Sequence, residues 1–226
     1  MTRRPDRPVP EGRSESAPPL FPPAKESDAP FAAAPVEFIG SFPNATVRLD
    51  PTRPEVVVLG RSNVGKSSLL NALFGRRLAR VSTTPGRTGH LNVYRLPTLY
   101  LLDLPGYGFA RLSHGERTRH AALVEGVITR RRSLRGVLWL LDIRHPPSDE
   151  DRRYAELLGA SGVPVLAALT KSDKLPFGQR AARQHAIAAE LALPAEQVQL
   201  TSSRSGEGIA DLGASILAAV AATEES

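Results

Sequence analysis

A single loop motif limits what this chain can fold into more than any other feature of its sequence. The apolar run Val56 to Leu59 precedes Gly60-Arg61-Ser62-Asn63-Val64-Gly65-Lys66-Ser67-Ser68, which matches the pattern G-x-x-x-x-G-K-[ST] without a gap. The apolar run predicts a buried parallel strand, and the segment from Ser67 to Phe74 predicts the first helix. The motif therefore predicts a phosphate-binding loop; the alternative is an ordinary glycine-containing turn between a strand and a helix.

The chemistry of such a loop explains its residue types. Backbone N–H groups at the positive end of a helix attract phosphate. Lys66 is suited to bridging β- and γ-phosphates, and the Ser67 hydroxyl is placed to ligate magnesium. The chain contains 25 arginines and only four lysines, and two of those four, Lys66 and Lys171, fall in candidate nucleotide motifs.

Length, charge and cysteine content narrow the class of protein. A chain of 226 residues can bury a full core in one domain, and the net charge of +6 with a pI of about 10.1 favours an anionic partner. The absence of cysteine excludes disulfides and cysteine zinc sites. Apolar runs such as 163–169 are too short to span a membrane, and no secretory signal is evident, so we expect a cytoplasmic protein, monomeric in the simplest case.

Residues 1–35 differ in composition from the rest of the chain. They hold nine of the 20 prolines, and their five basic and five acidic residues cancel. Such a segment buries too little apolar surface to offset its ordering entropy, so we expect a disordered tail, with a polyproline II ligand segment as the alternative. We expect the folded domain to span residues 36–223, with Phe38, Ile39 and Phe42 docked on its surface.

Beyond the tail, short apolar runs alternate with longer helical segments. We expect strands at 55–60, 91–96, 98–103, 136–142, 163–169 and 197–201, and helices at 66–74, 116–131, 149–159, 177–191 and 207–221. This alternation predicts an α/β fold in which helices cover both faces of a mostly parallel, six-stranded sheet.

Two further segments lie where loops that sense a nucleotide are expected. Asp103-Leu104-Pro105-Gly106 ends an apolar strand, so Asp103 can hold magnesium through water and the Gly106 N–H can meet the γ-phosphate; a simple Pro-Gly turn is the alternative. Before it lies the polar stretch Thr83-Thr84-Pro85-Gly86-Arg87-Thr88-Gly89-His90. A threonine hydroxyl there can complete the magnesium coordination, but spacing does not choose among the three threonines, and an ordinary surface loop is the alternative.

Two later loops carry candidate base-recognition residues. Thr170-Lys171-Ser172-Asp173 follows an apolar strand. The Asp173 carboxylate can accept hydrogen bonds from N1–H and the exocyclic amine of guanine, whereas N1 of adenine is itself an acceptor, and the Lys171 stem can cover the base plane. A helix N-cap is the alternative, although the carboxyl end of a strand favours ligand binding. Thr201-Ser202-Ser203, after the next strand, can approach the guanine O6 with backbone N–H groups.

Several of these stretches together resemble one family. Besides the phosphate-binding loop, they are Thr84-Pro85-Gly86-Arg87-Thr88, Asp103-Leu104-Pro105-Gly106-Tyr107-Gly108, Asp142-Ile143-Arg144-His145-Pro146-Pro147 and Thr170-Lys171-Ser172-Asp173. On these residues, roughly 36–223 of the chain resembles the EngB (YihA/YsxC) family of bacterial GTPases within the TrmE-Era-EngA-EngB-septin-like group. The resemblance implies a Ras-like G domain that binds and hydrolyses GTP with Mg²⁺, acts in large ribosomal subunit assembly, and has a role, direct or indirect, in division septum formation.

The resemblance also implies roles for single residues. Thr88 is the switch threonine on magnesium, and Lys66, Thr88 and Gly106 are the groups that act on the reacting phosphate. The family usually has Gln where Gly89 stands, so a contact made by that side chain is absent here. Tyr107 stands where Ras-like GTPases have the glutamine that orients water, so intrinsic hydrolysis is expected to be slow.

Asn63 raises the question of a second cation. Related GTPases with Asn at this position use its side-chain oxygen to help hold K⁺ against the phosphates, where the ion substitutes for an arginine finger. The alternative is that Asn63 stabilises the loop through local hydrogen bonds.

Arginine-rich stretches indicate where a nucleic-acid partner would bind. Residues 76–95 carry five arginines and no acid, and residues 111–135 carry seven arginines against two glutamates. They predict a basic surface facing ribosomal RNA, with a solvated helix face as the alternative.

Two rival functions compete with a GTPase switch. A P-loop ATPase or kinase is disfavoured by Asp173, because adenine offers the wrong donors. An RNA-binding module whose nucleotide site is only structural is disfavoured by the intact Lys66, Ser67 and Asp103.

Overall fold

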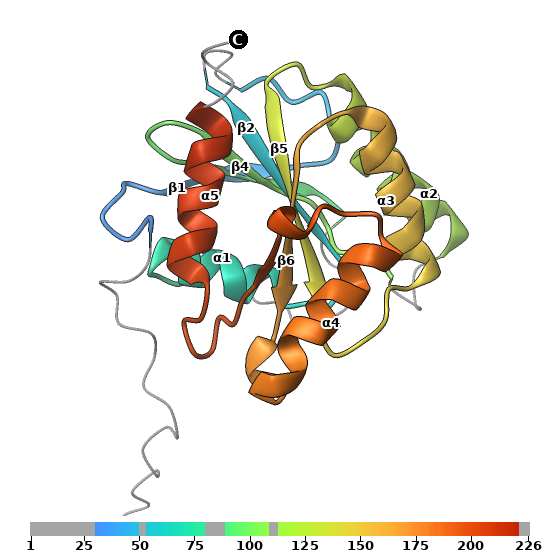
Figure 1. Ribbon diagram of the computed structural model, residues 1–226. Coiled ribbons are helices and arrows are strands. Elements are labelled where there is room, and N and C mark those ends of the chain that lie inside the picture. Colours follow the sequence, from blue (N-terminus) through green and yellow to red (C-terminus); the bar gives the residue numbers. More distant parts are fainter. Residues whose placement is uncertain (1–29, 50–52, 80–88, 109–112, 222–226) are drawn as a thin grey trace, which may run out of the picture.

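A seven-stranded sheet forms the centre of the fold in the computed structural model, which describes residues 30–49, 53–79, 89–108 and 113–221 (Figure 1). The strand order is β1-β3-β4-β2-β5-β6-β7. The strands are β1 (Glu37–Phe42), β2 (Glu55–Gly60), β3 (Leu91–Arg95), β4 (Tyr100–Asp103), β5 (Leu134–Asp142), β6 (Val165–Thr170) and β7 (Val198–Leu200). The strands from β4 through β2, β5 and β6 to β7 pair in parallel, whereas β3 runs antiparallel to both β4 and β1.

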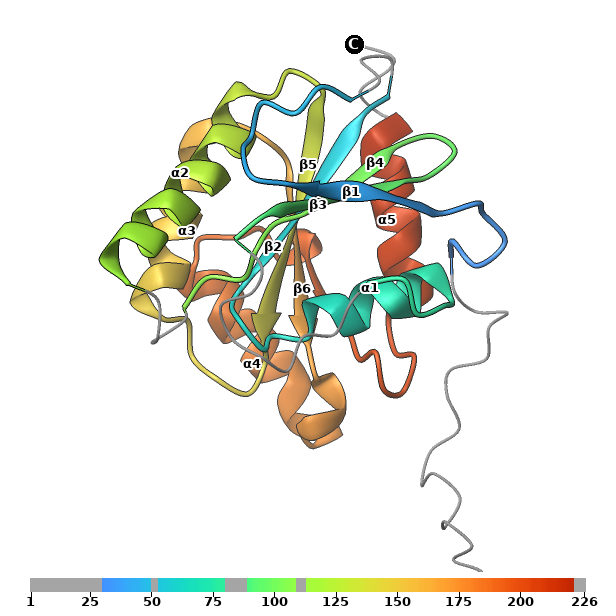
Figure 2. The same ribbon diagram turned by 180° about the vertical axis from the view of Figure 1, so that it is seen from behind.

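Helices cover both faces of this sheet. The helices are α1 (Lys66–Phe74), α2 (His114–Arg130), α3 (Asp149–Ser161), α4 (Phe177–Glu190) and α5 (Ile209–Ala221). Helices α1 and α5 pack on one face, and α2, α3 and α4 pack on the other (Figures 1 and 2). The predicted α/β fold with a mostly parallel sheet is therefore confirmed.

Strand β2 explains how two apolar layers form on one sheet. Its side chains alternate between the faces, so Val57 and Leu59 join the layer under α2, α3 and α4, while Val56 and Val58 join the layer under α1 and α5. All four are buried, as the continuous apolar run in the sequence requires of a central parallel strand. The phosphate-binding loop thus starts from the most deeply buried part of the fold.

The sheet has one strand more than the sequence predicted. Strand β1 forms from the segment expected to dock as a transition, and it pairs with β3 with an irregular register between Phe38 and Gly40. Phe38 and Ile39 stay exposed, so this edge strand lacks the alternating burial by which a strand is recognised in a sequence. The predicted count of six strands was therefore wrong by this edge strand.

The start of the described chain adds detail to the expected N-terminal boundary of the domain. Residues 1–29 of the expected tail lie outside the described residues, whereas Phe31 is buried and its N–H donates to the Leu73 carbonyl at 3.1 Å. Packing against the domain thus begins before the boundary expected at residue 36. None of the described helices is long and apolar enough to cross a membrane.

Candidate functional site

The loop between β2 and α1 has the conformation that its sequence motif requires. Gly65, directly before α1, has φ 104° and no side chain with which to cap the helix, so an anion can take the place of a capping group at the first-turn N–H groups. Asn63 also has a positive φ, 63°, and asparagine is among the few residues with a side chain that tolerate this region.

Lys66 and Asp103 meet beside this loop. The Lys66 ammonium group hydrogen-bonds the Asp103 carboxylate, and both side chains are largely buried. The second carboxylate oxygen accepts a hydrogen bond of 3.2 Å from the Asn92 amide on β3. Ser67 follows Lys66 on α1 and is half-buried. The structure therefore brings the lysine of the first motif and the aspartate of the second to one point.

The segment Asp103 to Tyr107 runs directly along the phosphate-binding loop. The Ser62 N–H donates to the Tyr107 carbonyl at 2.7 Å, and the Tyr107 N–H donates to the Gly60 carbonyl at 3.3 Å. A Cβ at Gly106 would lie 3.0 Å from the backbone N and Cα of Ser62. A larger residue at position 106 would require the two loops to move slightly apart.

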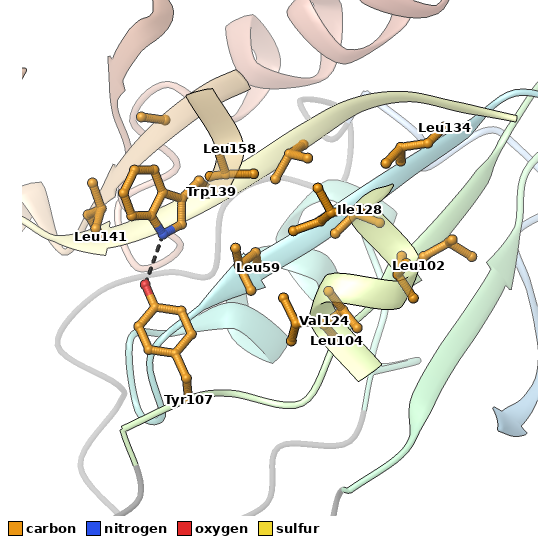
Figure 3. Close-up of a cluster of buried hydrophobic side chains, with 14 of the residues drawn as sticks. Leu59, Leu102, Leu104, Tyr107, Val124, Ile128, Leu134, Trp139, Leu141 and Leu158 are labelled. Atoms are coloured by element: carbon orange, nitrogen blue, oxygen red, sulfur yellow. Dashed lines mark hydrogen bonds between the residues drawn. The ribbon is translucent and has the colours of Figure 1, made fainter. Parts of the chain in front are cut away.

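The Tyr107 side chain points into the core. Its hydroxyl accepts a hydrogen bond of 2.8 Å from the Trp139 indole N–H (Figure 3). The same hydroxyl donates to the Asp151 carboxylate at 2.7 Å. Burial, reinforced by the Asp151 charge, raises the pKa of Tyr107 well above its usual value, so the hydroxyl stays protonated. A side chain held in this way does not orient water in the nucleotide site.

A second buried contact holds the same segment. The His120 Nε2 on α2 lies 2.8 Å from the Pro105 carbonyl, and because a carbonyl only accepts, Nε2 carries the proton. Burial lowers the pKa of His120, so the ring is neutral at physiological pH.

The loop after β6 closes on the phosphate-binding loop. The Thr170 hydroxyl donates to the Val64 carbonyl at 2.7 Å. Lys171, with φ 62°, donates from its ammonium group to the Asn63 carbonyl at 2.7 Å and to the Asp142 carboxylate at 2.8 Å. Its aliphatic stem therefore crosses between the two loops.

The loops after β6 and β7 are joined to each other. The Ser202 hydroxyl donates to the Asp173 carboxylate at 2.7 Å, and the Ser172 N–H donates to the Thr201 carbonyl at 3.1 Å. Ser203 is exposed beside them. The two sequence stretches predicted to read a guanine base thus lie together at the carboxyl edge of the sheet.

Two acidic residues that support these loops were not among the predicted site residues. Glu207 accepts the Ser172 hydroxyl at 2.6 Å and the Arg180 guanidinium at 2.8 and 2.9 Å. Asp142 binds both Arg144 and Lys171; burial alone would raise its pKa, but these hydrogen bonds outweigh burial and lower it to about 2. Asp142 belongs to a stretch quoted for the family resemblance, whereas nothing in the sequence points to Glu207.

A cavity of about 240 Å³ opens beside the phosphate-binding loop. It is bounded by that loop, by the segment that joins β5 to α3, and by the side chains of Arg61, Asp142, Arg144, His145 and Lys171. The lining also includes the buried Asp151, and the Asp142 carboxylate on it is paired with Arg144 and Lys171.

Part of the predicted site falls outside the described residues. This applies to Thr83 to Thr88, and so to Gly86, Arg87 and the threonine assigned to magnesium. Gly89 and His90 are described, and both are exposed.

Comparison with known proteins now identifies the family. A family model described as a 50S ribosome-binding GTPase matches residues 55–171. A probable GTP-binding protein EngB from Gemmatimonas aurantiaca is 42% identical over 187 residues, which cover 80% of this chain and 91% of the relative. The chain belongs to the EngB family of GTP-binding proteins. Another probable EngB, from Syntrophomonas wolfei, is 43% identical over 165 residues, covering 72% of this chain and 85% of that relative.

Solved structures agree with the fold of an EngB protein. The crystal structure of a probable GTP-binding protein engB has a TM-score of 0.65 at 22% identity, and the match covers 74% of this chain and 98% of that one. The structure of Era in complex with MgGDPNP and nucleotides 1506–1542 of 16S ribosomal RNA has a TM-score of 0.62 at 22% identity, covering 75% and 57% of the two chains. As an EngB-type protein with a P-loop GTPase domain, this chain binds GTP and hydrolyses it.

Proposed function

We propose that this EngB-family chain is a GTP-dependent switch in the assembly of the large ribosomal subunit. The observation that carries the proposal is the convergence of Lys66, Asp103, Asp173 and Ser202 at the carboxyl edge of one sheet, the place where doubly wound sheets bind ligands. The matching family model, described as a 50S ribosome-binding GTPase, supports the choice of partner. The role in division septum formation that the family resemblance implies for this chain stays a prediction.

We infer that Lys66 contacts the β- and γ-phosphates and that magnesium is held by the hydroxyls of Ser67 and Thr88 and, through water, by Asp103. The described residues contain no group of three His, Cys, Asp or Glu side chains that could hold a metal ion. Hydroxyl, phosphate and water oxygens fit magnesium, a hard cation that keeps several waters. When bound, the metal neutralises charge that develops on the phosphates.

We infer that hydrolysis without a partner is slow. Tyr107, which follows the Asp103 to Gly106 segment, is buried, and its hydroxyl is hydrogen-bonded to Asp151 and Trp139. Besides Lys66 and the magnesium ion, the groups proposed to stabilise the γ-phosphate are the Gly106 N–H and Thr88. A cation near Asn63 or a group from the ribosome would supply the missing stabilisation.

For the base, we infer that Asp173 accepts the two guanine donors and that the Lys171 stem covers the ring. The Ser202 hydroxyl, 2.7 Å from Asp173, orients that carboxylate. The hydroxyl bonds Oδ1 and the Lys174 ammonium group lies 3.6 Å from Oδ2, but each carboxylate oxygen has a second lone pair that can accept from a base.

For the ribosomal partner, we propose a groove of about 940 Å³ between residues 43–49 and α2. Its rim carries Arg48, Arg119 and Arg130, all exposed and without an ion pair to any acid in the described part of the chain. The acid on its lining, Glu55, is paired with Arg131. Arginines around a partly apolar floor suit phosphates and bases of ribosomal RNA.

Co-sedimentation with purified large ribosomal subunits tests both proposals. The native protein should associate more with a non-hydrolysable GTP analogue than with GDP or without nucleotide. The double change Arg119→Glu and Arg130→Glu should weaken association and reduce its log–log salt slope by about 2. The control reverses two exposed arginines on α3, Arg152 and Arg153, and should change neither. The proposal would be contradicted if association with the subunit changed neither with the bound nucleotide nor with the charge reversal in the groove.

A further inference from the structure

A small polar network lies inside the otherwise apolar layer under α2, α3 and α4. Its centre is the Tyr107 hydroxyl, bonded to Trp139 on β5 and to Asp151 on α3. The exposed fractions of the three residues are 3%, 0% and 3%. Buried polar groups persist when they are fully hydrogen-bonded, and here every polar atom of the three side chains has a partner.

Asp151 does more than begin a helix. One of its carboxylate oxygens accepts the backbone N–H and the hydroxyl of Ser148, at 2.7 and 2.6 Å, which completes the capping box of α3. The other oxygen is left for Tyr107, 44 positions away in the chain. A capping aspartate does not require that second contact, so the contact with Tyr107 needs its own explanation.

The backbone of Tyr107 supplies that explanation. Its N–H and carbonyl pair with Gly60 and Ser62 of the phosphate-binding loop, and the neighbouring Gly106 packs against the Ser62 backbone. The ring of Tyr107 also packs on Tyr154 of α3, with 4.4 Å between centroids. The side chain of Tyr107 therefore fixes the peptide groups around Gly106 against the phosphate-binding loop.

We propose that Tyr107, held by Asp151 and Trp139, is a positioning residue that keeps the Gly106 N–H aimed at the γ-phosphate. The proposal rests on the γ-phosphate role that we propose for Gly106. GDP lacks the γ-phosphate, so a looser Gly106 peptide costs affinity for GTP and leaves affinity for GDP unchanged. A hydrogen bond to a charged group is strong enough that its loss lowers affinity roughly 10-fold.

The test compares Tyr107→Phe with Tyr154→Phe, the same chemical change on the adjacent ring, whose hydroxyl has no hydrogen bond among the described contacts. Dissociation constants are measured by calorimetry for a non-hydrolysable GTP analogue and for GDP. We expect Tyr107→Phe to lower the affinity for the GTP analogue roughly 10-fold and to leave the affinity for GDP unchanged. Tyr154→Phe should change neither affinity. Equal effects on both nucleotides, or none on either, would overturn the positioning role.

A second pair of variants tests the proposal if Tyr107→Phe does not fold. Asp151→Ala removes the carboxylate half of the capping box together with the acceptor of Tyr107, whereas Ser148→Ala removes the hydroxyl half and leaves the Asp151 carboxylate bonded to Tyr107. Only Asp151→Ala should lower the affinity ratio of analogue to GDP, and equal ratios would overturn the proposal. If the native protein bound neither guanine nucleotide, the proposed function itself would fail, which distinguishes that failure from loss of the Tyr107 role.

Discussion

Asp142 lies between two cations, with its carboxylate 2.7 Å from the Arg144 guanidinium and 2.8 Å from the Lys171 ammonium group. Burial opposes its charge, yet these partners lower its pKa from 3.8 to about 2. A depressed folded-state pKa means that the charged form stabilises the fold above pH 4, and that this contribution fades as the pH falls from about 4 to about 2.

Asp142→Asn should therefore cost about 2 kcal/mol of unfolding free energy at pH 7, and clearly less at pH 3. Urea unfolding at the two pH values measures this difference. Asp149→Asn is the control, because that side chain is 91% exposed and its ion pair with Arg152 contributes little. Equal costs for the two variants at pH 7 would show that Asp142 is not held as described.

Asn63 tests the proposed K⁺ site. Its carbonyl binds Lys171 and its side chain is exposed, so the amide oxygen is accessible to a cation. GTP turnover should be faster in K⁺ than in Na⁺ at equal ionic strength, and Asn63→Ala should remove the difference. Asn63→Asp keeps a side-chain oxygen and tolerates positive φ, so it should retain part of the response. Identical native rates in both salts would rule out the K⁺ role.

Some site residues could be predicted from the sequence, and others could not. Lys66, Asp103 and Asp173 stand in short motifs whose local geometry the motif itself encodes, at the ends of strands that the apolar runs reveal. Asp151 and Glu207 act through contacts to residues 44 and 35 positions away. Such contacts depend on how elements pack, and a single sequence does not contain that information.

At the scale of elements, Arg131 joins the end of α2 to the sheet and to the groove. Its guanidinium pairs with Glu55 at the start of β2 and donates to the carbonyls of Ala45 and Val47 at 2.8 and 3.0 Å. Both charged side chains are at least nine-tenths buried. Arg131 was predicted as part of an RNA-facing surface, but the structure gives it these internal partners, so we leave it out of the charge-reversal test.

Arg131→Ala should cost about 3 kcal/mol of unfolding free energy, because it leaves the Glu55 carboxylate buried without its partner. Its neighbour Arg132 is exposed, so Arg132→Ala should stay within about 0.5 kcal/mol of the native protein. Denaturant unfolding of both variants compares them directly. Similar losses would mean that the buried pair does not stabilise the junction between α2 and the sheet.

Element boundaries were predictable where the sequence carries a burial pattern or a cap. All six predicted strands and five predicted helices are present, and every end lies within two residues of its expected position. Helix α2 begins at His114 because Ser113 and Glu116 form a capping box, whereas α5 begins at Ile209 because hydrogen bonds between Ser202 and residues 206 and 207 hold a turn before it. The exposed strand β1 was missed because pairing with β3, rather than burial, defines it.

At the scale of the whole molecule, sheet topology assembles the site. Strands β2, β5, β6 and β7 lie side by side in parallel, so the loops after β2, β6 and β7 emerge at one edge. The ion pairs and hydrogen bonds among Lys66, Asp103, Asn63, Lys171, Asp173 and Ser202 then join segments spread over most of the domain. This edge is where we propose that the guanine base is recognised.

The most direct test of this account is the affinity of the native protein and of Asp173→Asn for GDP and for XDP. In the proposed complex the native carboxylate accepts from N1–H and the exocyclic amine of guanine, whereas xanthine carries a carbonyl in place of that amine and needs a donor. The native protein should prefer GDP by roughly 100-fold or more, and the variant, whose amide can donate, should prefer XDP. A variant that keeps the native preference for GDP, or a native protein that binds ADP as tightly as GDP, would contradict the account.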